Sequence, residues 1–189
     1  MKRPIVKEHV GKVAPPYTYW VIEDQFLAGG YPSDFLADRG GKPLTSLLDA
    51  GIRTFIDLRE EEETDPATDR PSSYHAILKK LADFRHVEFS CIRIPIADLG
   101  IPSMWTMRLI LDSIDSSLKD RQPVYVHCFG GLGRTGTVVG CFLMRHGIAD
   151  ESNVLDKIRE LRHRTELGKE PSPHTPQQIQ MVVNWKRFA

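Results

Sequence analysis

The chain has 189 residues, of which 41% are hydrophobic and 26% are charged, and its 25 basic residues balance its 25 acidic residues. This length and composition are typical of one globular domain, which we assign to residues 1–189 with residues 1–19 as an N-terminal extension. The absence of net charge argues against broad nucleic-acid binding, and no apolar run reaches the length of a membrane span. We therefore expect neither nucleic acid nor a membrane as a partner, and we also expect a monomer.

Apolar stretches bounded by turn residues predict the strands. The first stretch forms a hairpin that turns at Glu23 and Asp24. The predicted strand segments are residues 20–29 (the hairpin), 53–58, 87–94 and 123–126. Residues 60–73 are polar and contain two prolines, so we expect a surface loop there.

Helical patterns alternate with these strands along the chain. We expect Ser103 to cap one of the helices. The predicted helices are residues 44–50, 74–84, 103–118, 137–146, 153–164 and 176–188. Alternation of this kind predicts a single α/β domain whose central sheet is flanked by helices on both faces.

Residues 123–136 carry the most informative pattern in the chain. An apolar strand runs into His127 and Cys128, a glycine-rich loop follows, and Arg134 stands six positions after Cys128, before a helix. A tight loop that opens a helix turns successive N–H groups inward, and the helix dipole adds partial positive charge, so this arrangement can hold a phosphate beside a thiolate. The backbone amides that we expect to bind the phosphoryl group are those of Phe129, Gly130, Gly131, Leu132, Gly133 and Arg134.

Cys128 is the predicted nucleophile. The loop amides, the helix dipole and Arg134 favour its thiolate, which can attack phosphorus and form a phosphocysteine. Arg134 offers a planar fork that can bind two phosphate oxygens, so we expect no metal and no cofactor. We expect the Thr135 hydroxyl to hydrogen-bond the sulfur and help it leave, and we interpret His127 as a brace that hydrogen-bonds the loop.

Expulsion of the leaving oxygen requires a proton donor. After residues 87–94 the chain enters a loop containing proline and glycine, and the carboxylate of that loop is Asp98. A loop suits a mobile acid that closes over substrate, and the same group, once ionised, can activate water. The alternative is that Asp98 is a turn residue with local hydrogen bonds only.

The segment from His127 to Thr135 resembles the signature of the cysteine-based protein tyrosine phosphatases: His, Cys, two residues, Gly, one residue, Gly, Arg, then Ser or Thr. Together with residues 95–102, it is similar to the kinase-associated phosphatase branch of the dual-specificity phosphatases. Residues 27–32 and 51–59 resemble the opening segments of small phosphatases of this type. The resemblance implies a protein tyrosine phosphatase-like fold with Asp98 as the general acid.

One position departs from the family pattern. Many relatives carry a Gln before a Thr near the C-terminus, where the Gln positions the hydrolytic water, and here His174 precedes Thr175. Either His174 positions water, or that function is weak or absent. Gln178 has another explanation, because residues 175–178 fit a helix capping box with proline at the first helical position, and we favour capping for it.

The expected substrate is a phosphorylated protein or peptide. Classical tyrosine-specific relatives carry a Lys-Asn-Arg-Tyr segment that deepens the pocket, and its absence here implies a shallower cleft open to phosphotyrosine, phosphoserine and phosphothreonine. A phosphatase of inositol phosphates or another metabolite is an alternative, disfavoured because Phe129, Gly130 and Leu132 are not basic. A phosphate-binding pseudoenzyme is the other alternative, which His174 keeps open.

The three cysteines have no disulfide-framework spacing, and the N-terminus lacks a signal-peptide core, so we expect a cytoplasmic location. Cys141 and Cys91 are expected to pack in the core. A reversible disulfide between Cys91 and Cys128 is an alternative that would protect the nucleophile from irreversible oxidation. We interpret residues 60–63, all glutamate, as a solvated loop that pairs with Arg59.

Overall fold

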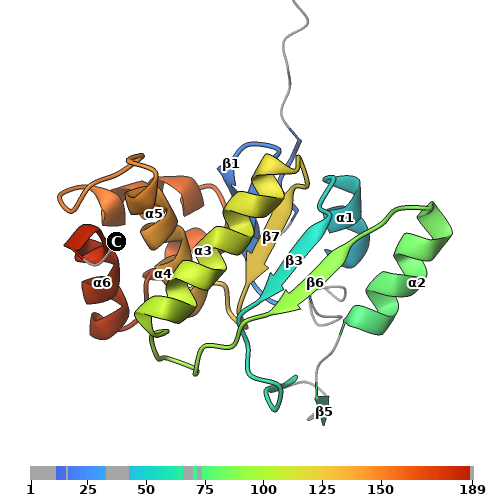
Figure 1. Ribbon diagram of the computed structural model, residues 1–189, viewed down its shortest axis with the longest axis horizontal. Helices are drawn as coiled ribbons and strands as arrows, with labels where there is room; N and C mark the ends of the chain where they lie inside the picture. Colours follow the sequence, from blue (N-terminus) through green and yellow to red (C-terminus); the bar gives the residue numbers. More distant parts are fainter. Residues whose placement is uncertain (1–11, 16, 33–42, 66–69, 72–73, 188–189) are drawn as a thin grey trace, which may run out of the picture.

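The computed structural model describes residues 12–15, 17–32, 43–65, 70–71 and 74–187 (Figure 1). Residues 1–11 and 16 of the expected N-terminal extension lie outside this description. The first strand begins at Thr18, inside the range that we had assigned to the extension. Within the described residues, no helix is both long and apolar enough to cross a membrane.

A five-stranded sheet forms the centre of the fold, in the order β1-β2-β7-β3-β6. Only β1 runs antiparallel, to β2, and the other neighbours are parallel. The strands are β1 (Thr18–Ile22), β2 (Phe26–Gly29), β3 (Thr54–Asp57), β6 (Ser90–Arg93) and β7 (Val124–His127), with a separate ribbon of β4 (Thr64–Asp65) and β5 (Arg70–Pro71). Because parallel strands end at one edge of the sheet, the loops that follow β2, β3, β6 and β7 gather there.

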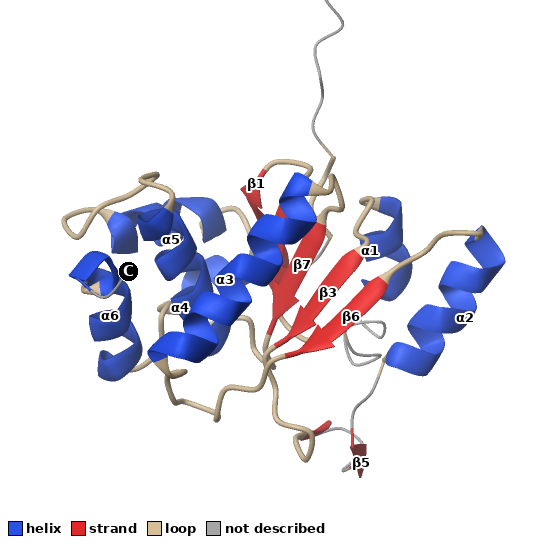
Figure 2. Ribbon diagram, in the orientation of Figure 1, coloured by secondary structure: helices blue, strands red, loops and turns tan. Residues whose placement is uncertain are grey.

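Helices cover both faces of the sheet, as predicted (Figure 2). One face packs against α1 and α2, and the other against α3 and α4, with α5 and α6 beyond them. The helices are α1 (Pro43–Asp49), α2 (His75–Arg85), α3 (Met104–Lys119), α4 (Gly133–Arg145), α5 (Val154–Arg162) and α6 (Pro176–Val183), with 3-10 turns at Glu166–Lys169 and Trp185–Arg187.

The two faces follow from the alternation of side chains along each strand. Phe55 and Tyr125 belong to the core cluster beneath α1 and α2, whereas Ile56 and Val126 belong to the cluster beneath α3 and α4. The side chain of Ser103 accepts a hydrogen bond from the Thr106 N–H at 3.0 Å, which confirms the predicted cap of α3. All four residues named on these strands are fully buried, so the sheet has no solvent-facing side at its centre.

Three boundaries differ most from the predictions. α4 begins at Gly133, four residues before the predicted start at residue 137, so that Arg134 lies in its first turn. The last helix ends at Val183, and a short 3-10 turn follows it. β6 covers only residues 90–93 of the predicted strand 87–94 and forms the edge of the sheet.

Candidate active site

The loop after β7 forms the floor of a pocket of about 410 Å³. Cys128 lies at the start of this loop and is 3% exposed. The positive φ of Gly131, 71°, and its close approach to Gly29 require glycine, since a Cβ at Gly131 would lie 2.6 Å from the Gly29 carbonyl carbon. The loop leads directly into α4, whose N-terminal amides and dipole favour an anion beside Cys128.

The pocket brings together side chains from four separate segments. The predicted site residues that line it are Asp98, Cys128, Phe129, Gly130, Leu132, Gly133, Arg134, His174 and Gln178. Three of the predicted residues, His127, Gly131 and Thr135, are buried and are not among the residues that line the pocket. The expected nucleophile Cys128, the cation Arg134 and the candidate acid Asp98 therefore share one cavity at the carboxyl edge of the sheet, where ligands bind in open α/β sheets.

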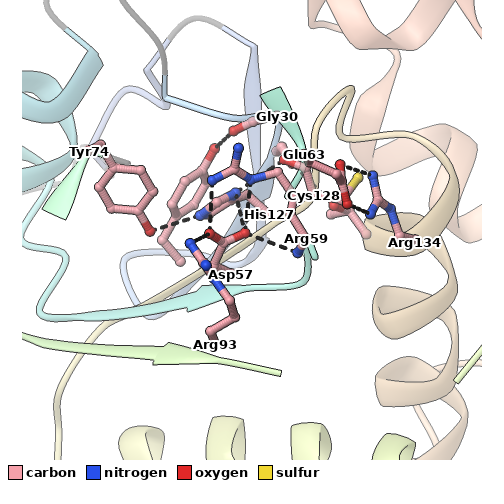
Figure 3. A network of polar contacts seen from close by, with 12 residues as sticks. Gly30, Asp57, Arg59, Glu63, Tyr74, Arg93, His127, Cys128 and Arg134 are labelled. Carbon is pink, nitrogen blue, oxygen red and sulfur yellow. Dashed lines mark hydrogen bonds and ion pairs between the residues drawn. The ribbon is translucent and has the colours of Figure 1, made fainter. Parts of the chain in front are cut away.

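Arg134 is 2% exposed and is held by three groups. Both of its terminal nitrogens bind the carboxylate of Glu63, with Nη2 at 2.9 Å from Oε2 (Figure 3). Nη1 also donates to the Ile96 carbonyl oxygen at 3.1 Å, and Nη2 lies 3.0 Å from Asp98 Oδ1. Burial is the largest influence on the guanidinium and would lower its pKa, but the hydrogen-bonded Glu63, together with the charges of Cys128 and Asp98, raises it. Arg134 is therefore a fixed, charged group.

Glu63 is a site residue that the sequence did not distinguish. We had interpreted residues 60–63 as a solvated loop, and this is wrong for Glu63, which is 19% exposed and paired with Arg134. Burial is the largest influence on its carboxyl and would raise the pKa, but the hydrogen bonds from Arg134 and the Glu60 N–H, together with the charges of Arg134 and Arg59, lower it. The Glu60 N–H donates to Glu63 Oε1 at 2.8 Å and so fixes the turn. Four identical residues in a row give no signal of which one faces inward.

Asp98 lies on the loop after β6, as predicted, and its side chain is 67% exposed at the mouth of the pocket. The loop follows the sheet as far as Ile96, whose N–H donates to the Leu58 carbonyl at 2.9 Å, and then turns, with the Gly100 N–H donating to the Ala97 carbonyl at 2.9 Å. An exposed carboxylate on a short turn beside the nucleophile can reach the oxygen that leaves phosphorus.

The hydroxyl of Thr135 donates to the carbonyl oxygen of Gly29 at 3.2 Å. The expectation that it bonds the sulfur of Cys128 is wrong in this structure, because a hydroxyl has one proton and Gly29 takes it. Strand β2 lies next to β7 and brings this carbonyl to the helix. The same segment is tied to the loop again by the Tyr31 N–H, which donates to the Phe129 carbonyl at 2.8 Å.

His127 makes the hydrogen bond that we expected of a brace. Its Nδ1 lies 3.1 Å from the Cys128 carbonyl oxygen, and its Nε2 lies 2.8 Å from the Tyr74 hydroxyl. A carbonyl can only accept, so Nδ1 carries the proton and Nε2 accepts from Tyr74. Complete burial lowers the pKa of His127 to about 4, against the opposing effect of Asp57 nearby, so the ring is neutral.

A buried ion pair supports the histidine from the neighbouring strand. The carboxylate of Asp57 binds Arg59 at 2.9 Å and Arg93 at 3.3 Å, and lies 3.8 Å from His127 Nδ1 (Figure 3). Burial would raise the pKa of Asp57, but His127 and Arg59 together lower it. The guanidinium of Arg59 also lies 3.7 Å from the ring centre of Tyr31. The partner that we had expected for Arg59 was the glutamate run, and the structure adds Asp57.

The segment of residues 172–178 contacts two loops of the site. These are the loop of residues 128–132 after β7, here called the phosphate loop, and the loop of residues 94–103 after β6, here called the acid loop. Gln178 forms the predicted capping box with Thr175, which confirms its capping role. Its Nε2 also donates to the Gly100 carbonyl on the acid loop at 2.9 Å, while Ser172 Oγ donates to the Leu132 carbonyl on the phosphate loop at 2.8 Å. His174 lines the pocket with an exposed side chain. The segment of residues 172–178 therefore fixes the two loops and His174 relative to one another.

The three cysteines have different environments. Cys141 is fully buried in α4, as predicted, whereas Cys91 is exposed because β6 is an edge strand, so its expected place in the core is wrong. β3 separates Cys91 from the strand that leads to Cys128, and two strand spacings amount to roughly 9.5 Å. This exceeds the span of a disulfide, about 7 Å between Cα atoms, so the Cys91–Cys128 bridge is wrong for this fold.

A family model described as "Polymorphic toxin system, DSP-PTPase phosphatase" matches residues 41–148, a range that includes β3, Asp98, Cys128 and Arg134. The chain belongs to the DSP-PTPase phosphatase family. This confirms the resemblance to the dual-specificity cysteine phosphatases, and the central sheet with helices on both faces is the fold expected of them. Within the described residues of this DSP-PTPase domain, no group of His, Cys, Asp and Glu has an arrangement that could hold a metal ion.

Individual relatives agree with this family. Human dual specificity protein phosphatase CDC14A is 26% identical over 167 residues, which cover 88% of this chain and 26% of that protein. The crystal structure of kinase associated phosphatase has a TM-score of 0.66 at 19% identity and covers 93% of this chain and 97% of that one. PTPMT1 in complex with PI(5)P has a TM-score of 0.64 at 20% identity, with coverages of 91% and 96%. The chain spans less than half the length of the curated relatives that it matches.

Proposed function

We propose that this chain removes phosphate from phosphoproteins through a phosphocysteine intermediate, with phosphotyrosine, phosphoserine and phosphothreonine as substrates. The observation that carries the proposal is the convergence of three groups in one pocket. Cys128 lies at the floor, Arg134 is buried beside it, and the Asp98 carboxylate lies 3.0 Å from Arg134 at the mouth. These are a nucleophile, a phosphate-binding cation and a proton donor.

The reaction follows from these positions in two steps. Cys128 Sγ attacks phosphorus, the bond from phosphorus to the substrate oxygen breaks, and Asp98 gives its proton to that oxygen. The loop amides and Arg134 bind the remaining phosphoryl oxygens as negative charge develops on them. Water then attacks phosphorus, its proton passes to the Asp98 carboxylate, and inorganic phosphate and the Cys128 thiolate are released.

The walls of the pocket favour a substrate with a single phosphate. Arg134 is the only Lys or Arg among the described residues that line it, and Glu63 and Asp98 are the acidic members of the lining. A ligand with several phosphates, such as an inositol polyphosphate, would meet two carboxylates and one arginine, which already pairs with both. Against this, the neighbour PTPMT1 was solved with PI(5)P. We extend the proposal to a monomer in a reducing compartment such as the cytoplasm, with no nucleic acid or membrane as a partner.

A turnover panel tests the proposal. Phosphotyrosine, phosphothreonine and phosphoserine peptides are compared with PI(5)P and soluble inositol phosphates, and phosphate release is measured for the wild type and Cys128→Ser. We expect release from the peptides, and none with Cys128→Ser, which should still bind inorganic phosphate. Turnover of inositol compounds alone would favour the metabolite phosphatase, and phosphate binding without any turnover would favour the pseudoenzyme.

A further inference from the structure

Leu99 combines a costly backbone conformation with an exposed side chain, and the stability of the fold does not explain this combination. It lines the pocket, is 55% exposed, and has a φ of 57°, in the left-handed region that non-glycine residues avoid. The left-handed conformation costs roughly 1–2 kcal/mol for a residue with a side chain, and Asn or Gly is the usual occupant. An exposed leucine recovers little of this cost through burial, and its apolar side chain is free to contact a ligand in the pocket.

Phe129 presents a second apolar surface to the same pocket. Its ring is 37% exposed and stacks on Tyr31, with the ring centres 6.4 Å apart and the planes 10° from parallel. The backbones of the two residues are joined as well, and the guanidinium of Arg59 lies over the Tyr31 ring. A ring held by stacking loses little conformational entropy when it contacts a ligand. Phe129 is therefore a fixed aromatic surface directly after the nucleophile.

We propose that Leu99 and Phe129 bind the phenyl ring of phosphotyrosine, and that this domain prefers phosphotyrosine to phosphothreonine and phosphoserine. The inference rests on the proposed protein-phosphatase function and names its substrate class. A phosphotyrosine phosphate on the loop places a phenyl ring between the floor and the mouth of the pocket, where these two side chains lie. Phosphothreonine and phosphoserine have no group there, so the same walls gain almost no contact with them.

The test uses two peptides that differ only in the phosphorylated residue, tyrosine or threonine. The ratio of their kcat/KM values is measured for the wild type, Leu99→Asn and Phe129→Ala. Asn tolerates a positive φ, so the first variant removes the apolar side chain and keeps the turn. The two leaving groups differ chemically, but this difference is the same in every variant, so a change in the ratio reports recognition of the ring.

We expect each variant to lower the ratio of tyrosine to threonine about three- to tenfold, the range typical of one lost aromatic or aliphatic contact. Phe84→Ala is the matched control, since Phe84 is an exposed phenylalanine on α2, 83% accessible, and does not line the pocket. It should leave the ratio unchanged.

Equal losses on both peptides would overturn the inference, because they would assign the two side chains to loop geometry. Inhibition by inorganic phosphate distinguishes a change in loop geometry from the loss of a contact with the ring. A changed loop geometry weakens phosphate binding, whereas loss of the Leu99 or Phe129 side chain alone does not. An unchanged ratio in both variants would overturn the inference as well, while leaving the protein-phosphatase proposal in place. Absence of turnover on both peptides by the wild type would instead contradict that broader proposal.

Discussion

The carboxylate of Glu63 binds the guanidinium of Arg134 with both of its oxygens, although the two residues are 71 positions apart in the chain. Paired hydrogen bonds of this kind fix the plane of the guanidinium as well as its position. In the proposed reaction, the substrate would therefore meet an arginine that is already oriented, and no reorganisation would be needed as charge develops on the phosphoryl oxygens.

Glu63→Gln should lower kcat/KM for an aryl phosphate by about tenfold. The amide keeps the shape of the side chain but loses the charge and one acceptor, so Arg134 keeps one neutral hydrogen bond to residue 63 beside its bonds to Ile96 and Asp98. Steady-state kinetics would measure this loss. The matched control is Glu61→Gln, an exposed member of the same run, which should retain wild-type kinetics. Equal effects of the two variants would reduce the role of Glu63 to general surface charge.

Asp98→Asn should slow hydrolysis much more for alkyl phosphates than for activated aryl phosphates. An alkoxide is a poor leaving group and needs the proton, whereas an activated phenoxide leaves without it, and general acids typically contribute about 10²–10⁴-fold. The dependence of kcat/KM on the pKa of the leaving group would be measured for both proteins, and it should be steeper in the variant. Parallel dependences would remove Asp98 from the acid role.

The parts of the site that lie within one short segment could be predicted from the sequence. Strand, phosphate loop and helix follow one another over residues 123–136, and each has its own local pattern. The caps at Ser103 and Thr175 were also predicted, because a cap is a contact between residues three positions apart. In such cases the separation of two residues along the sequence determines how close they lie in the fold.

Most of the contacts that were missed join distant segments. The Thr135 hydroxyl bonds Gly29, 106 positions away, because β2 lies beside β7. Cys91 was expected in the core, and it is exposed because β6 lies at the edge of the sheet. Both outcomes depend on the order of the strands, and the apolar pattern of a strand does not state which strands will be its neighbours. Glu63 contacts Arg134 across 71 positions, and the four identical residues of its run gave no signal of which one faces inward.

His174→Ala should convert steady turnover into a burst. If His174 positions the hydrolytic water, its loss slows the second step, so one equivalent of aryl alcohol per enzyme is released rapidly and phosphocysteine accumulates. Rapid-mixing kinetics and intact-protein mass spectrometry would detect both. His174→Gln, which introduces the residue that relatives carry, should restore turnover without a burst. Identical steady-state rates in wild type and His174→Ala would exclude this role.

The stability of the fold should decrease as the pH falls from 7 to 5, and His127 should account for much of the decrease. Its pKa is about 4 in the folded protein and about 6.5 in an unfolded chain, so between these values the unfolded state binds more protons. The stabilisation is complete above pH 6.5 and is lost toward pH 4. Between pH 7 and 5 the loss from this one group amounts to about 2 kcal/mol.

Urea unfolding at a series of pH values measures this loss, and His127→Asn is the decisive variant. The variant will be less stable at every pH, because Asn replaces a buried ring that bonds Cys128 and Tyr74, but its stability should change by about 2 kcal/mol less over the window. His163→Asn, at an exposed histidine, is the matched control and should keep the wild-type slope. The pKa of Asp57 is lowered from its usual value of 3.8, so the stabilisation that Asp57 contributes is lost only below that pH, outside the window. A wild-type slope in His127→Asn would mean that the ring is already protonated in the folded protein, and the neutral brace beneath Cys128 would have to be abandoned.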